Sequence, residues 1–127
     1  MSKFDSEALN QLLKQTKKQL RGGLLATNIW DRETEEEYAQ LNDQRTAVRM
    51  FNALTDSIDS VLQNSQFPQL RNYYILELEQ SHLAVIVRHG DDVLQGLLLD
   101  IKECNIGVLL SLTIPNLRKA VKAARLS

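Results

Sequence analysis

One long amphipathic segment, Asp43–Asn64, constrains the fold of this chain more than any other feature. Apolar residues recur along it at spacings of three and four, which places them on one face of a helix. That face carries Ala47, Phe51, Leu54, Ile58 and Val61, and the other carries Arg45, Arg49, Asn52, Asp56, Asp59 and Gln63. We expect a helix, capped by Asn42 or Asp43, whose apolar stripe covers a sheet and whose polar stripe faces solvent or a partner.

The segments on either side of this helix have the patterns of strands and of a further helix. Upstream, Ser6–Leu20 predicts a helix that begins at Asp5 or Ser6 and ends where a glycine of Gly22-Gly23 adopts a positive φ. A hairpin around an acidic turn follows. The expected strands, two before the central helix and three after it, are Leu24–Trp30, Glu37–Leu41, Asn72–Glu79, Leu83–Arg88 and Val93–Ile101.

The C-terminal region allows two interpretations. Asn105–Leu112 is apolar on all sides, and Pro115 follows three residues later. One long helix could begin at Asn105 and bend at Pro115, or a separate helix could begin with Thr113 as its N-cap. We expect the bent helix and keep the two-element interpretation as the alternative.

Length and element order together predict the fold class. The 127 residues suit one domain spanning residues 1–127, and 43% of them are hydrophobic, enough for a packed core. The order is α-β-β-α-β-β-β-α. We therefore expect an α+β fold with a five-stranded antiparallel sheet and helices on its faces.

Charge and cysteine content narrow the environment and the partners. The formal charge of −1 offers no overall field for nucleic acid, although Asp31–Glu37 is acidic and no acidic residue follows Glu103. A single cysteine, Cys104, cannot form an intrachain disulfide, and the N-terminus lacks the apolar core of a secretion signal. Apolar runs are too short to span a bilayer. We expect a cytoplasmic protein without membrane insertion and without nucleic acid.

The residues that carry enzyme chemistry are sparse in this chain. His82 and His89 stand at predicted turns, where we expect exposed side chains, and one Cys with two His is too few for a zinc site. Cys104 has no neighbouring His in the sequence, which favours a structural role. No phosphate-binding loop or nucleophile elbow is present. We predict no enzymatic activity, no catalytic residue, no cofactor and no metal.

The strand Asn72–Glu79 has the character of an interface. Tyr73, Ile75 and Glu77 alternate with Tyr74 and Leu76, so that one face is apolar while the other mixes acids with apolar groups. If it lies at a sheet edge, its free backbone groups can pair with another chain. A two-fold axis through it would give a dimer with a continuous sheet.

Several short motifs resemble the roadblock/dynein-light-chain family. They are Gly23–Trp30 as a first strand, Phe51-Asn52-Ala53-Leu54 in the central helix, the meander Leu83–Leu99 and Asn105-Ile106-Gly107 opening the last helix. The resemblance implies a non-enzymatic homodimer or heterodimer that binds a small Ras-like GTPase or serves as an adaptor in a signalling or motility assembly. It also implies a dimer interface of Phe51, Thr55, Asp59, Tyr73, Tyr74, Ile75, Leu76 and Glu77. The partner contacts that it implies are Arg45, Arg49, Asn52, Asp56 and Asp59, with Arg45 or Arg49 a conceivable arginine finger.

Two other functions fit the same fold class. A small-molecule-sensing module would need polar groups in an apolar cleft, for which Asn28, Thr27 and Tyr38 are the candidates. A purely structural subunit of a larger complex needs no site of its own. The oligomeric state and the response to ligands separate these alternatives.

Overall fold

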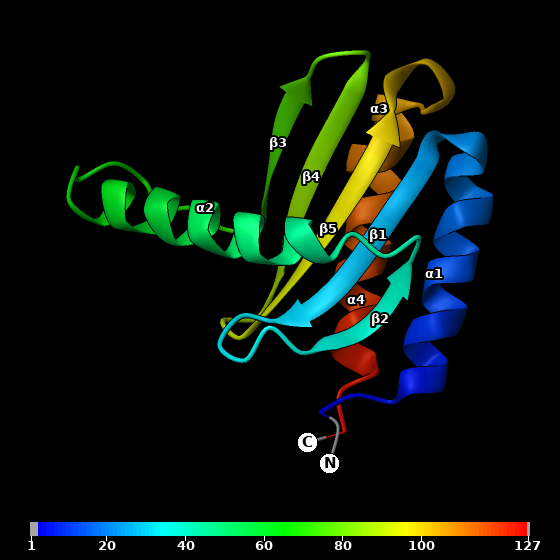
Figure 1. The fold of residues 1–127 in the computed structure, drawn as a ribbon, viewed down its shortest axis with the longest axis horizontal. Helices are drawn as coiled ribbons and strands as arrows, with labels where there is room; N and C mark the ends of the chain where they lie inside the picture. Colours follow the sequence, from blue (N-terminus) through cyan, green and yellow to red (C-terminus); the bar gives the residue numbers. More distant parts are fainter. Residues whose placement is uncertain (1–2, 127) are drawn as a thin grey trace.

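Five antiparallel strands form the centre of the fold in the computed structural model, which describes residues 3–126 (Figure 1). Their order across the sheet is β2-β1-β5-β4-β3. The strands are β1 (Leu24–Asp31), β2 (Glu37–Leu41), β3 (Tyr73–Leu78), β4 (His82–His89) and β5 (Val93–Asp100). The hairpin β1–β2 and the meander β3–β4–β5 are joined by the central helix, as predicted, and the α+β fold class is confirmed.

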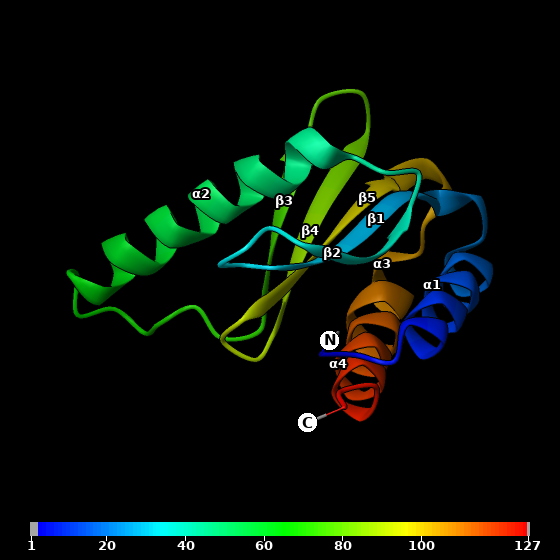
Figure 2. The ribbon, with the colours of Figure 1, turned by 60° about the horizontal axis from the view of Figure 1, so that its bottom comes forward.

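Helices cover both faces of the sheet. α1 (Ser6–Leu20) and α4 (Ile114–Ala123) lie side by side on one face, and α2 (Arg45–Gln63) crosses the other (Figures 1 and 2). Four short helical segments complete the chain: η1 (Arg21–Gly23), η2 (Ile101–Glu103), α3 (Ile106–Val108) and η3 (Leu109–Thr113). The α1–α4 side and the α2 side are therefore two separate surfaces of the molecule.

The sheet has an apolar cluster on each face, and the two differ in size. The larger one packs leucines of α1 and α4 against alternate residues of the strands, among them Val85 and Leu99. The smaller one lies under α2 and comprises Trp30, Val48, Ile86 and Leu94. α1 and α4 are thus held by a broad apolar contact, whereas α2 rests on a narrow one.

Turn residues set the register of the meander. Gly90 adopts φ +73° between β4 and β5, a conformation that glycine reaches without a Cβ clash. Gln80 and Ser81 adopt φ near +60° between β3 and β4 without a glycine. β4 is longer than predicted, because it extends to His82 and His89.

The ends of the first two helices differ in part from expectation. Asp5 caps α1 by accepting from the amide of Ala8 at 3.2 Å, as predicted. Arg21, not a glycine, adopts the positive φ of 55° after α1. Gly23 is needed for another reason, since a Cβ there would lie 2.9 Å from Cβ of Cys104. At α2 the predicted Asn42 or Asp43 cap was wrong.

The N-cap of α2 is Gln44, whose side chain makes no cap hydrogen bond. Asp43 instead accepts a bond from Nδ2 of Asn28 at 2.8 Å. The polar residue before the helix therefore ties α2 to the neighbouring strand β1 rather than to its own first turn.

The C-terminal helical run is continuous, in agreement with the single-helix prediction. Thr113 has helical φ and ψ, which excludes it as the N-cap of a separate helix. The amide of Ile114 bonds to the carbonyl of Leu109, five residues back, so that a π-helical turn precedes Pro115. Proline has no amide hydrogen, and the wider turn accommodates it without ending the helix. Asn105 caps the run by accepting from the amide of Val108 at 3.0 Å.

The two ends of the described chain are held together. Phe4 forms an isolated β-bridge with Arg125, whose guanidinium also lies 4.9 Å from the centre of the Phe4 ring. Lys3 reaches Asp31 at 2.9 Å. Burial would raise the pKa of Asp31, but bonds from Lys3, from the amide of Thr34 and from Tyr38 outweigh it and hold that pKa far below the usual range.

Candidate protein interface

The edge strand β3 leaves one side of its backbone without a partner among residues 3–126. β3 pairs only with β4, and it ends the sheet on that side. Tyr73 is 38% exposed, Glu77 is exposed, and Tyr74, Ile75 and Leu76 are half-buried. An exposed edge with free amides and carbonyls is a template for pairing with another strand. The condition stated for pairing with another chain, that this strand lies at a sheet edge, is met.

Polar bonds fasten α2 to the sheet. Asn52 accepts from Nε1 of Trp30 at 2.8 Å and donates to the carbonyl of Arg32 at 2.8 Å. Thr55 is buried and shares a 2.8 Å hydrogen bond with the hydroxyl of Tyr74. Burial raises the pKa of Tyr74, so its phenol stays neutral. The face of α2 that meets the sheet is therefore largely polar.

An ion-pair cluster extends this attachment. Asp59 accepts from Arg88 at 2.9 Å and lies 3.4 Å from Arg32, which also reaches Asp56 at 2.7 Å. Both arginine side chains are largely shielded from solvent. Asp59 and Asn52, predicted to face a partner, serve instead to hold α2 in place, and Asn52 is only 7% exposed.

α2 is consequently turned about its axis by roughly a quarter turn from the predicted orientation. Val48, Asn52 and Thr55 are its buried residues, whereas Leu54 and Ile58 are half-buried and Val61 is 66% exposed. The prediction that the stripe from Ala47 to Val61 covers the sheet was wrong. The stripe lies along the side of the helix and leaves apolar surface open.

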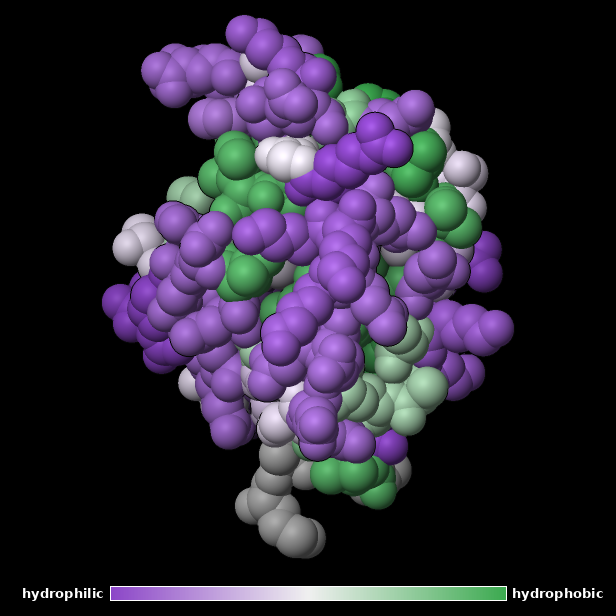
Figure 3. Space-filling view, turned by 90° about the vertical axis from the view of Figure 1, so that its right-hand side faces the viewer, coloured by the Kyte–Doolittle hydropathy of each residue, from purple (hydrophilic) through white to green (hydrophobic). Residues whose placement is uncertain are grey.

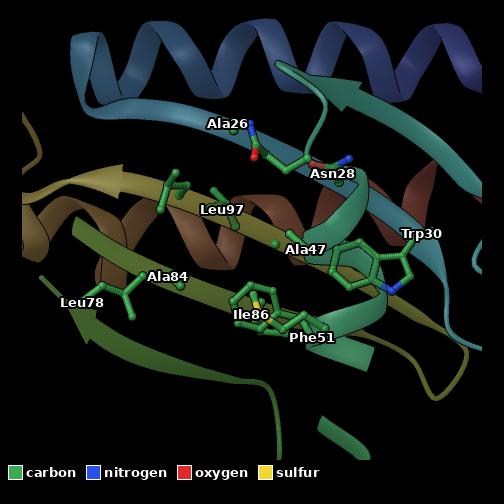
Figure 4. Close-up of a pocket in the computed structure, with 13 residues that line it drawn as sticks. Ala26, Asn28, Trp30, Ala47, Phe51, Leu78, Ala84, Ile86 and Leu97 are labelled. Carbon is green, nitrogen blue, oxygen red and sulfur yellow. The ribbon is translucent and has the colours of Figure 1, made fainter. Parts of the chain in front are cut away.

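A shallow apolar groove of about 190 Å³ runs beside this stripe. Its floor comes from the sheet and includes Ala26, Ala84 and Leu97, and its wall comes from Ala47 and Phe51 of α2 (Figure 4). Leu78, at the end of β3, closes the groove toward the sheet edge. The groove, the stripe and the edge strand are continuous with one another.

The opposite side of α2 meets the acidic turn between β1 and β2. Arg45 pairs with Glu37 at 2.8 Å, and Arg49 lies 3.6 Å from Glu35. Both guanidinium groups remain exposed to solvent. The acidic turn thus sits next to the arginines of α2. Of the predicted partner contacts, Arg45, Arg49 and Asp56 share an exposed surface.

Two exposed apolar residues, one in the second turn of α2 and one beyond its C-terminal end, are interface candidates that the sequence patterns did not single out. Phe67, in the loop after α2, is 68% exposed, and Met50 is exposed on the helix. The sign of such residues in the sequence was the length of the predicted helix, which is long for a sheet of this width. By contrast, Phe51 and Thr55, two of the predicted dimer contacts, pack against the sheet of their own chain.

The groups proposed for a small-molecule site do not converge. Asn28 lines the groove, but its amide bonds to Glu37 and Asp43. Thr27 bonds to the carbonyl of Gly96, and Tyr38 donates to Asp31 at 2.9 Å. Neither Thr27 nor Tyr38 lines the groove. Its lining is apolar apart from Asn28, Trp30 and Gln44.

Residues with reactive side chains lie apart from this surface. His89 is 5% exposed, so the prediction of an exposed turn residue was wrong. Its Nε2 lies 2.9 Å from Oε1 of Gln95, and burial lowers its pKa to about 4. Cys104 is a buried free thiol. Within residues 3–126 no cluster of metal-binding side chains occurs, and no helix there is long and apolar enough to cross a membrane.

Solved structures share this fold. MglB of Myxococcus xanthus matches with a TM-score of 0.78 at 9% identity, over 100% of this chain and 97% of its own. The gliding protein MglB of Thermus thermophilus matches at 0.71 and 12%, over 94% and 92% of the two chains. A roadblock/LC7 domain of Streptomyces avermitilis matches at 0.65 and 15%, over 90% and 94%. No family model and no curated protein matches the sequence. The chain has the roadblock fold, as the resemblance implied.

Proposed function

We propose that this chain is a non-enzymatic regulatory subunit that forms a homodimer through β3 and α2 and binds a small Ras-like GTPase. The observation that carries the proposal is the continuity of an unpaired strand edge with an open apolar stripe on α2. The fold shared with MglB, a gliding protein in Thermus thermophilus, supports a role in a motility or signalling assembly.

The length of α2 supports pairing across β3. A helix of 19 residues is about 28 Å long, whereas four adjacent strands span only about 14 Å from first to last. α2 begins over β1 and passes beyond β3 at the sheet edge (Figure 1). Val61 therefore lies past the sheet, where this molecule offers it no cover. A second sheet continuing from β3 would supply that cover.

A two-fold axis also accounts for the groove. α2 crosses β3 at Tyr74, near the start of the strand. A two-fold axis through the middle of β3 puts the second copy's α2 near the other end of the strand, at the level of Leu78. The groove opens there. The two copies of α2 then run antiparallel, with their stripes of Ala47, Phe51, Leu54, Ile58 and Val61 in contact.

The arginine side of α2 is the proposed GTPase contact. Arg45 and Arg49 remain exposed in the arrangement described, and each lies beside an acidic residue, Glu37 and Glu35 respectively. A guanidinium supplied by a partner can stabilise charge on a transferring phosphoryl group, which is one use for these side chains.

Binding to purified small Ras-like GTPases of the same host tests the proposal. Each GTPase is loaded with GDP or with a non-hydrolysable GTP analogue and titrated with the chain. We expect one GTPase to bind the dimer more tightly in its GTP-analogue form. Equal binding of the two forms, or none for any GTPase, would contradict the GTPase assignment and leave the dimer to be judged separately.

A further inference from the structure

The near-neutral total charge conceals a strong separation between two parts of the chain. Residues 3–23 and 101–126 contain ten Lys and Arg against three Asp and Glu, a net formal charge of +7. Residues 24–100 contain five Lys and Arg against thirteen Asp and Glu, a net charge of −8. All seven lysines of the chain belong to the first set.

The fold converts this separation in sequence into a separation in space. The two basic segments lie about 80 residues apart along the chain, yet α1 and α4 lie side by side on one face of the sheet (Figure 2). The acidic turn and α2 belong to the other side. We call α1, α4 and the short segments joined to them the basic layer, residues 3–23 and 101–126.

The cations of the basic layer are available to a partner. They line the outward faces of both helices as Lys14, Lys17, Lys18, Arg118, Lys119 and Lys122, all exposed. Among residues 3–126 none of these six forms an ion pair. The face over α1 is mostly hydrophilic (Figure 3). An extended surface of uncompensated positive charge remains.

The composition of this surface favours a membrane over a nucleic acid. Phe4 is the one aromatic residue of the basic layer and is buried, so the layer offers no ring on which bases could stack. Lysines outnumber arginines, and lysine acts as a mobile point charge rather than a bidentate phosphate fork. Leu110 and Leu112 are exposed in the same layer and can contact the apolar edge of lipid headgroups.

We propose that the basic layer adsorbs to the surface of a membrane rich in anionic lipids, without insertion of a helix. Juxtaposition of lysines on two neighbouring helices, backed by a rigid sheet, matches a planar negative surface. Adsorption through this face directs α2 away from the bilayer. The inference is independent of the proposed dimer and GTPase, because one chain alone carries the charge.

Vesicle co-sedimentation of the full chain tests the proposal. The probes are vesicles of phosphatidylcholine with and without phosphatidylglycerol, at low and high salt. We expect binding only to the anionic vesicles, weakening as salt rises. Each cation near an anionic surface strengthens binding about fivefold, so Lys14→Gln/Lys17→Gln/Lys18→Gln should weaken it about 100-fold. Arg118→Gln/Lys119→Gln/Lys122→Gln should do the same from the other helix.

A control variant with the same change in net charge distinguishes the effect of where the cations lie from the effect of the total charge of the chain. Gln40→Glu/Gln66→Glu/Arg71→Gln alters three exposed positions outside the basic layer and should keep wild-type binding. Circular dichroism confirms that each variant is folded. Three results would overturn the proposal: no binding to anionic vesicles, equal weakening by the control variant, or tighter binding to a DNA duplex than to the vesicles at the same salt.

Discussion

The indole Nε1 of Trp30 donates a hydrogen bond to Oδ1 of Asn52 at 2.8 Å, and this bond joins β1 to α2 beneath the helix. It orients α2 so that its polar residues meet the sheet and its apolar stripe faces sideways. Replacing Asn52 by Ala removes the acceptor of a buried hydrogen bond from Trp30 and the donor of a part-buried hydrogen bond to the carbonyl of Arg32.

We expect Asn52→Ala to lower the free energy of unfolding by about 3 kcal/mol, because each unsatisfied buried group costs about 1–3 kcal/mol. Urea unfolding followed by tryptophan fluorescence measures it. Ser57→Ala, on the exposed outer face of α2, is the control and should change stability by less than about 0.5 kcal/mol. Equal stability of the two variants would show that the bond does not fasten the helix.

His89 makes stability depend on pH. Burial lowers the pKa of its imidazole to about 4, with Arg118 and Arg125 acting in the same direction, whereas the unfolded chain titrates near 6.5. Between these values the unfolded state binds the proton more readily. Stability is therefore complete above pH 6.5 and falls as pH drops toward 4, by up to about 3 kcal/mol.

Unfolding free energies measured between pH 6.5 and 4 check the sign of this pH dependence and its assignment to His89. His89→Gln should remove the decline between pH 6.5 and 4, whatever its effect at neutral pH. His82→Gln, at the start of β4, should retain it. A decline that survives in His89→Gln would assign the pH dependence to other groups.

Arg49 is the exposed cation whose reversal tests the GTPase surface. Its only ion pair among the described residues is a 3.6 Å approach to Glu35, so Arg49→Glu should leave the fold and the dimer intact. We expect at least about a tenfold loss of affinity for the GTP-analogue form, the scale of one lost charge contact of about 1.4 kcal/mol. Isothermal titration calorimetry measures it. Unchanged affinity would show that this side of α2 faces solvent and does not contact the GTPase.

Local patterns predicted the elements, but not the orientation of α2. The periodicity of leucines in Ser6–Leu20 and the alternation in β3 reflect burial against the nearest neighbour, so the bounds of these elements agree closely with the structure. The orientation of α2 depends on Trp30, Arg32 and Arg88, which lie 20 residues or more away in sequence from their partners on the helix. Periodicity alone assigns an apolar face to the core and cannot detect such bonds.

Local sequence patterns also predicted the candidate interface in outline. β3 lies at the sheet edge, as pairing with another chain requires, and Arg45 and Arg49 are exposed as expected. Asn52 and His89 were misplaced because a polar residue at a turn or on a helix looks solvent-facing until its tertiary partner is known. Gln95, the partner of His89, lies on the neighbouring strand.

Val61 provides a direct test of the role of the apolar stripe. It is 66% exposed and lies beyond the sheet edge, so Val61→Glu should not disturb the folded chain. In the dimer it places a charge between two copies of α2, and we expect the dissociation constant to rise by at least about 100-fold, as for a buried unpaired charge. Ser60→Glu adds the same charge at an exposed position on the arginine side of α2 and should dimerise normally. Light scattering after size-exclusion chromatography distinguishes the two variants.

Sedimentation equilibrium of the wild-type chain tests the central claim most directly. Pairing through β3 and α2 predicts a species of twice the 14.5 kDa mass of one chain at micromolar concentration. A species of 14.5 kDa that persists at high micromolar concentration would contradict the dimer and leave the β3 edge and the α2 stripe as monomer surface.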